Sequence, residues 1–293
     1  EFSYENLNFS SKKIQFINKK KSFSIEGQID NNDFYVSEEI LKNFLNPILK
    51  IDLKKLRFSS ENKFFLEIND KFKISDYEIK SLLDLKEASI KNILNTKNIF
   101  PNSQTDINFK NHQVELIYQK NYLFVNGQGD ILIQKNFDTV DYKIKKTKDA
   151  HLFNIKLNLS DNPITFDLLN YKIDDKAEAT LIFDGKHIKD KSLSFKNIQF
   201  KSGSDLIDID NLKLTNDFKI MSMKSANLQF TDNQDKKNIF QIKNIKENYI
   251  LLGKVFNANK LINDLIFDDI KDNKIFNEDL NLKIDIKKVY LHD

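Results

Sequence analysis

The residues best suited to catalysis or metal binding do not stand at the spacings that these functions require. The four histidines, His112, His151, His187 and His292, are far apart in the chain, and none has a second ligand at helical or turn spacing. A metal site needs three or four ligands that converge on the ion. The chain has no cysteine, which excludes a disulfide, a thiolate metal site and a cysteine nucleophile. We therefore expect no metal centre.

Two further patterns have structural explanations. Gly127-Gln128-Gly129 superficially resembles a phosphate-binding loop, but it lacks a third glycine and a following Lys-Ser/Thr pair, and strand-like residues come next. It predicts a strand or hairpin in which glycine permits a bend or a close backbone approach. Acidic pairs such as Asp208 and Asp210 are typical of the solvated side of a strand. We expect neither an enzyme nor a cofactor.

The composition of the chain excludes further functional classes of protein. The 293 residues include 46 basic and 43 acidic side chains, and no basic block with interleaved aromatic residues stands out, so nucleic-acid binding is not expected. The longest apolar runs, such as Ile250-Leu251-Leu252, are far shorter than the ~20 residues that span a bilayer. The sequence opens at Glu1-Phe2 inside a strand pattern, which we interpret as an excerpt from a longer protein.

Apolar residues alternate with polar ones along nearly the whole chain. Such alternation is typical of strands with one buried and one solvated face. Turn residues such as Asp161-Asn162-Pro163 separate the segments, so we expect roughly a dozen or more strands, mostly in antiparallel meanders. The clearest apolar sets are Phe23, Ile25 and Ile29; Phe64, Leu66 and Ile68; Leu123, Val125, Ile131 and Ile133; Leu181 and Phe183; and Leu282, Ile284 and Ile286.

Two segments have helical spacing instead. Residues 37–45 (SEEILKNFL) begin with an N-cap serine and end before Pro47, and residues 259–267 (NKLINDLIF) repeat this design with an asparagine cap. Residues 86–98 fit either a third helix or the end of a strand.

Each predicted helix leads into a similar nine-residue sequence, KIDLKKLRF at residues 50–58 and KIDIKKVYL at residues 283–291. In both, the alternation changes phase at a lysine pair. One extra residue in a β-bulge explains this change, and a tight turn between two strands is the alternative. The shared order of strand, helix and long strand suggests a structural repeat.

The predicted strands create one extended apolar face, which two or three short helices are too few to cover. Such a face must close as a sandwich or barrel, or curl into a trough that holds an apolar ligand.

The run from Ile164 to Ile266 contains ITFDLLNYKI, AEATLIFDG, LSFKNIQFKSG, IDIDNLKL and YILLGKVFNANKLINDLI, and DLNLKIDIKKVYL follows it. With these motifs the run resembles the AsmA-like family, specifically the repeating β-groove proteins of the YhdP and TamB type. In that family a strand ends in glycine, a Phe-Asp/Asn-Ala turn enters a short helix, and a long strand follows. Gly253, Phe256, Asn257 and Ala258 occupy the matching positions here.

The resemblance implies an elongated, curved antiparallel sheet, a β-groove or half-pipe, that continues across residues 1–293 with a repeat boundary near residues 100–110. Residues 110–293 match the family better than residues 1–100. It also implies a segment of a Gram-negative cell-envelope protein that conducts phospholipid through the periplasm between the inner and outer membranes. The parent protein would carry the inner-membrane anchor.

On this interpretation, nine apolar residues are our candidates for contact with the acyl chains of lipid: Leu123, Val125, Ile131, Ile133, Leu181, Phe183, Leu282, Ile284 and Ile286. One alternative is a structural or adhesive β-solenoid or sandwich whose apolar face is closed internally. Another is a factor that assembles outer-membrane proteins through exposed sheet edges.

Overall fold

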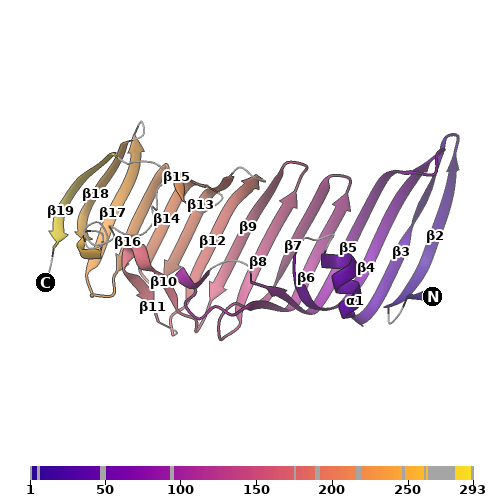
Figure 1. The fold of residues 1–293 in the computed structure, drawn as a ribbon, viewed down its shortest axis with the longest axis horizontal. Helices are drawn as coiled ribbons and strands as arrows, with labels where there is room; N and C mark the ends of the chain where they lie inside the picture. Colours follow the sequence, from indigo (N-terminus) through magenta and orange to yellow (C-terminus); the bar gives the residue numbers. More distant parts are fainter. Residues whose placement is uncertain are drawn as a thin grey trace. The chain divides into compact units, whose positions relative to one another are not determined.

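The computed structural model of the chain describes residues 2–4, 7–46, 51–92, 96–174, 176–188, 192–215, 219–245, 248–260, 262 and 281–291. These residues are mostly β-strand in open, mostly antiparallel sheet with little helix, which confirms the predicted fold class at this level (Figure 1). The chain divides into two compact units. Unit 1 contains residues 1–94, 104–133 and 137–149, and unit 2 contains residues 95–103, 134–136 and 150–293. The continuous groove with a boundary near residues 100–110 stays a prediction.

Unit 1 is a meander in which each strand pairs antiparallel with the next. Its strands are β1 (Phe2–Tyr4), β2 (Leu7–Lys19), β3 (Ser22–Tyr35), β4 (Leu53–Asn69), β5 (Ile74–Lys91), β6 (Asp106–Gln119), β7 (Tyr122–Leu132) and β8 (Asp138–Lys146).

The helical segment of unit 1 lies where the sequence predicts it. The α-helix α1 (Glu38–Ile40) continues as one π-helical stretch, η1 (Leu41–Leu45), and the Ser37 hydroxyl accepts a hydrogen bond from the Ile40 amide at 3.4 Å. Leu41 is 2% exposed and packs in a core with Phe34, Val36, Leu53 and Ala88. The segment therefore covers one end of the sheet face.

Unit 2 has a similar meander with one parallel pair. Its strands are β9 (Ala150–Leu159), β12 (Ala179–Ile188), β13 (Ser192–Ser202), β14 (Asp205–Leu214), β15 (Ile220–Ser222), β16 (Ser225–Thr231), β17 (Lys237–Ile245), β18 (Asn248–Asn257) and β19 (Asn281–Tyr290). They pair in the order β9, β12, β13, β14, β16, β17, β18 and β19, with β15 beside the end of β14. Only the pair β18–β19 is parallel among these described pairs.

A small ribbon closes one end of the unit 2 sheet face. It consists of β10 (Ile164–Phe166), the 3-10 turn η3 (Asp167–Leu169) and β11 (Tyr171–Ile173). Tyr171 is 1% exposed, and its ring centroid lies 5.8 Å from that of Phe200 and 5.4 Å from that of Phe230. Burial raises the pKa of the Tyr171 hydroxyl, so the ring stays neutral in this core.

The other helical predictions have mixed outcomes. The described residues contain fewer helices than expected. Residues 86–91 belong to β5, so the strand alternative is correct there, and a 3-10 turn, η2 (Thr96–Asn98), follows. The Ile262 amide donates to the Ala258 carbonyl at 2.9 Å, but residues 261 and 263–267 of the second predicted helix lie outside the described residues.

The lysine pairs of the two similar sequences lie inside β4 and β19, so the tight-turn alternative is wrong for both. In β4, Lys54 is an extra residue between the pairs Leu53–Ile90 and Lys55–Ser89, as a bulge requires. The alternation of β19 also changes phase, but β19 pairs with β18 without a register shift. The extra residue is instead Lys254 of β18, which lies between the pairs Phe240–Gly253 and Ile239–Val255 that β18 forms with β17.

The suggested repeat shares the order of its elements but not their pairing. Strands β3 and β4 flank the first helical segment and are antiparallel, whereas β18 and β19 are parallel. A parallel pair needs a crossover connection, so the two units route the chain differently after the same local pattern.

A further bulge explains one of the two glycines of YLFVNGQGDILI, Gly129, and both glycines lie inside β7 as predicted. Asn111 and His112 of β6 stand opposite the single residue Gly129, and Asn111 adopts a left-handed φ of 55°. A Cβ on Gly129 would lie 2.8 Å from the His112 Cα atom. The absence of a side chain at Gly129 therefore makes room for the bulged strand.

Replacing this glycine tests the bulge. We expect Gly129→Ala to lower the free energy of unfolding by about 1–3 kcal/mol, because the added methyl group must push the His112 backbone away. Urea unfolding provides the measurement. The control is Gly203→Asn, at a φ of 53° with nothing within 4 Å of the added Cβ, which asparagine tolerates. Equal losses from the two variants would contradict the explanation.

Burial of His112 also predicts a pH dependence of stability. The side chain is 0% exposed, its Nε2 lies 2.9 Å from the Asp130 carbonyl oxygen, and its Nδ1 lies 3.3 Å from the Tyr142 hydroxyl. Burial lowers the pKa of His112 below its ordinary 6.5. The unfolded chain then binds this proton first as the pH falls, so stability is complete above pH 6.5 and declines below it.

We expect His112→Gln to flatten the decline in unfolding free energy between about pH 7 and 5, which urea unfolding at a series of pH values measures. An unaltered slope in His112→Gln would assign the decline to another group.

Candidate functional site

The register of unit 1 places apolar side chains of successive strands side by side on one face. Phe16 lies opposite Ile25, Ile25 opposite Leu66, and Leu66 opposite Tyr77. Cross-strand partners of this kind point to the same side of a sheet. We call this side the apolar face of unit 1; its members are Ile14, Phe16, Phe23, Ile25, Ile29, Phe64, Leu66, Ile68, Tyr77, Ile79, Leu83, Val114, Leu116, Tyr118, Leu123, Val125 and Ile144.

This face is covered at one end and exposed at the other. The segment α1–η1 packs over the end near Leu53. At the opposite end, where β2 turns into β3 and β4 into β5, Phe16 is 73% exposed and Ile74 is 59% exposed. Between the ends, most side chains are half-buried by their own neighbours. The described part of unit 1 has no second sheet packed on this face.

A short polar row interrupts the apolar face without leaving an unpaired group. Asn62 donates to the Ile29 carbonyl at 2.9 Å and to the Ser60 hydroxyl at 2.7 Å. The Ser60 hydroxyl donates in turn to Asn31 Oδ1, whose amide nitrogen donates to the Phe58 carbonyl at 3.2 Å. Because these groups satisfy one another, the row presents little unmet hydrogen-bonding demand to a ligand.

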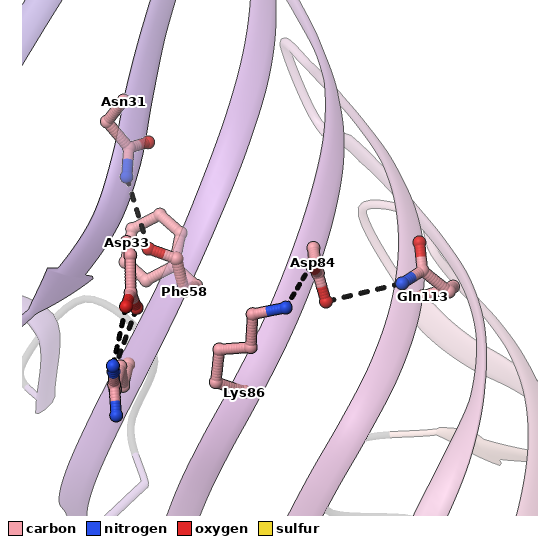
Figure 2. A network of polar contacts seen from close by, with 7 residues as sticks. Asn31, Asp33, Phe58, Asp84, Lys86 and Gln113 are labelled. Carbon is pink, nitrogen blue, oxygen red and sulfur yellow. Dashed lines mark hydrogen bonds and ion pairs between the residues drawn. The ribbon is translucent and has the colours of Figure 1, made fainter.

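Near the polar row, unit 1 also carries charged side chains that pair with neighbouring groups (Figure 2). Arg57 donates to both carboxylate oxygens of Asp33, at 2.8 and 2.5 Å, and these hydrogen bonds lower the pKa of Asp33. Asp84 accepts from Lys86 and, at 3.2 Å, from Gln113. Arg57 and Asp33 are 47% and 49% exposed, so the pair adds little stability and is typical of a solvated surface.

The opposite face of the sheet contains a depression of about 200 Å³. Lys63 and Lys80 line it together with Glu61, Glu115 and Leu82. The two positive and two negative charges balance, so the depression offers no electrostatic preference for a charged ligand.

Of the candidates in unit 1, two lie on the apolar face and two are more buried. Leu123 and Val125 are half-buried in β7, opposite Tyr118 and Leu116. Ile131 and Ile133 are each 8% exposed. Ile131 lies opposite Phe109, which packs against the core under α1–η1, and the Ile133 carbonyl accepts from the Gln104 amide at 2.9 Å.

Two candidates of unit 2 lie on β12. Leu181 is 2% exposed and stands opposite Phe200, which packs against Tyr171 of the β10–β11 ribbon. Phe183 is half-buried, with its ring centroid 6.1 Å from that of Phe195. Leu181 therefore belongs to the core under the ribbon, whereas Phe183 lies two residues further along the same face.

The last three candidates lie on β19. Leu282 is 45% exposed and Ile284 is 51% exposed among the described residues, and they stand opposite Tyr249 and Leu251 of β18. Ile286 is half-buried opposite Gly253.

Of the members of the apolar face named above, the nine candidates include only Leu123 and Val125 of β7. The alternation in the sequence groups the apolar residues of β3 and β4, which are not among the candidates, and it does not reveal those of β5. In β5, Tyr77, Ile79 and Leu83 belong to the apolar face. The adjacent Leu82 is also apolar, but it lies on the other face and is 61% exposed. The Leu82-Leu83 pair hides the alternation, and the helix–strand ambiguity of residues 86–98 obscured the strand further.

The fold also brings together two histidines that are distant in the sequence. His151 of β9 and His187 of β12 are cross-strand partners, with ring centroids 6.1 Å apart and an interplanar angle of 25°. In the part of the chain that the structure describes, no three or more histidine, aspartate or glutamate side chains are arranged to hold a metal ion. His292 lies outside that part.

None of the described helices has the length and apolar character needed to cross a bilayer. Comparison of the chain with protein-family models, with curated proteins and with solved structures gave no match. The chemistry of the two sheet faces is therefore the guide to function.

The difference between the faces predicts the effects of truncating two nearby residues of β5. Ile79→Ala removes a half-buried side chain that packs beside Phe64 and Tyr118, and we expect it to lower the free energy of unfolding by roughly 1–2 kcal/mol. Leu82→Ala, on the opposite face, should change it by less than ~0.5 kcal/mol. Denaturant unfolding of the two variants makes the comparison, and a larger loss for Leu82→Ala would contradict the assignment of the faces.

Proposed function

We propose that the apolar face of unit 1 holds the acyl chains of phospholipid. On this proposal the chain is a segment of a cell-envelope protein that carries phospholipid along an apolar β-groove between inner and outer membranes. The observation that carries the proposal is an apolar face that spans several strands and that, among the described residues, is covered by a helical segment at one end and exposed at the other. An acyl chain is an occupant that matches its extent and chemistry.

The free-energy cost of exposing the acyl chains of a lipid to water is large. Moving a lipid through water exposes its acyl chains at about 0.8 kcal/mol per CH₂ group, so a 16-carbon chain costs roughly 12 kcal/mol. A continuous row of aliphatic and aromatic side chains such as Phe16, Ile25 and Leu66 would replace water along most of that length. The polar headgroup could stay in water beyond the exposed end.

The details of the face favour a ligand without a fixed shape. Its side chains are flexible aliphatic groups and scattered rings, and its polar row of Asn31, Ser60 and Asn62 is satisfied internally. Such a surface gives little directional hydrogen bonding, so it suits sliding of a chain better than recognition of a rigid ligand. This conduit requires neither a catalytic group nor a cofactor.

The resemblance to the AsmA-like family supports transport over storage, and it supports a periplasmic location with an inner-membrane anchor supplied by the parent protein. Phospholipid and the two membranes are the proposed partners. Nucleic acid is not among them.

The test uses the absence of native cysteine, which permits single-site labelling. Val125 and Phe124 are adjacent, similarly half-buried residues on opposite faces of β7. Each is replaced by cysteine in the full chain and labelled with a small fluorophore. We expect a phospholipid with a quencher on its acyl chain to quench Val125→Cys at least several-fold more strongly than Phe124→Cys. Organic extraction and mass spectrometry of the unlabelled protein should detect phospholipid.

Equal quenching at the two positions would refute the assignment of the apolar face as the acyl site. Reproducible absence of phospholipid, together with no uptake of the quencher lipid, would refute lipid carriage. Crosslinks to polypeptide in place of lipid would indicate an assembly factor for outer-membrane proteins.

A further inference from the structure

The hairpin turns at the exposed end of unit 1 concentrate positive charge. Four segments, residues 18–23, 68–75, 118–123 and 144–149, contain nine lysines and two acidic residues. The strand register places them along one edge of the sheet, because Ser22 pairs with Asn69, Gln119 with Tyr122, and Leu123 with Lys146. We call these four segments the turn rim.

The opposite end of the same strands lacks this excess. Residues 32–46, 51–57, 86–92, 104–111, 130–133 and 137–140 contain seven basic and eight acidic residues. The net charge of the whole chain is only +3, so the turn rim is a local accumulation and not a consequence of composition.

Most of the rim lysines lack a carboxylate partner. Lys19 forms an ion pair with Glu67 at 3.2 Å. Within the described residues, none of the other eight rim lysines forms an ion pair with a carboxylate. Their charges are therefore available to an anionic surface.

An exposed aromatic residue stands at the tip of this rim. Phe72 lies between Lys71 and Lys73 in the turn from β4 to β5, is 85% exposed and has a φ of 56°. Its ring makes one edge contact with Phe23, at 6.4 Å between centroids. Glycine or asparagine suits this backbone conformation, whereas a bulky side chain is strained in it. The contacts of Phe72 within the protein therefore do not explain why a phenylalanine occupies this position.

Other apolar side chains at this end of unit 1 are also exposed. Phe16 is 73% exposed, Ile74 59%, Ile17 43% and Tyr118 42%. Aromatic and aliphatic side chains interspersed with lysines are typical of surfaces that enter the headgroup layer of a bilayer.

We propose that the turn rim docks unit 1 on the surface of an anionic phospholipid bilayer, with Phe72 inserted among the headgroups and the surrounding lysines paired with phosphate. The charge of the rim selects an anionic surface, and its exposed rings select one with an accessible apolar layer. This contact is made by the chain itself and does not depend on the binding of an acyl chain to the apolar face.

The experiment is co-sedimentation of the full chain with vesicles of phosphatidylcholine alone or with about 30% phosphatidylglycerol. Binding is expected only with the anionic vesicles and should weaken as salt rises from 0.1 to 0.5 M, because exposed charges are screened. We expect Lys71→Gln/Lys73→Gln to lower the partition coefficient by about five-fold for each lysine removed. Phe72→Asn should lower it several-fold while leaving the melting temperature unchanged or higher, because asparagine accepts the left-handed φ.

The matched control is Lys55→Gln/Lys91→Gln, which removes the same charge from two exposed lysines at the opposite end of unit 1. It should bind as the unaltered chain does. Equal binding to neutral and anionic vesicles would overturn the proposal, as would equal losses in the control and in Lys71→Gln/Lys73→Gln. Undiminished binding of Phe72→Asn would overturn the insertion of the ring. Since vesicle binding is measured separately from quenching at Val125→Cys, either proposal can fail alone.

Discussion

The structure depends on one constraint: a strand with period-two alternation places all its apolar side chains on one side, and a single-layer sheet gives that side no partner. Among the described residues of unit 1, the segment α1–η1, around Leu41, covers one part of the apolar face. In unit 2 the β10–β11 ribbon buries Tyr171 against Phe200 and Phe230 at one end. These short elements bury a core at one end of each sheet, and neighbouring side chains half-bury much of the remaining apolar surface.

Keeping that surface on one side requires control of register. A slip of one residue would move every apolar side chain of a strand to the charged face. Bulges absorb extra residues, for example at Lys54 in β4, at Asn111–His112 in β6 and at Lys254 in β18. Gly129 shows the steric requirement, since the bulged strand approaches it too closely for a side chain. The same devices that bend strands therefore preserve the chemical difference between the faces.

Local patterns in the sequence predicted the features that depend on interactions between residues close together in the chain. The alternation predicted the strands, the Ser37 cap predicted the helical segment, and the lysine pair predicted the bulge at Lys54. Features that depend on pairing between distant segments were not predictable in this way. No local signal distinguishes the parallel pair β18–β19 from the antiparallel pair β3–β4, or shows that the ribbon buries Leu181. The exposed Leu82 interrupted the alternation of β5, so the central strand of the apolar face was missed as a site.

The two ends of the strands in unit 1 differ in a way that alternation alone does not require. At one end, acidic and basic groups balance and a helical segment closes the apolar face. At the other, lysines surround exposed apolar side chains, and the chain accepts a strained backbone at Phe72. Stability would be served better by asparagine at that turn and by charge balance around it. The strained backbone at Phe72 and the repulsion among the surrounding lysines both oppose folding. An anionic surface with an accessible apolar layer explains both, because it would bind the lysines and the exposed ring.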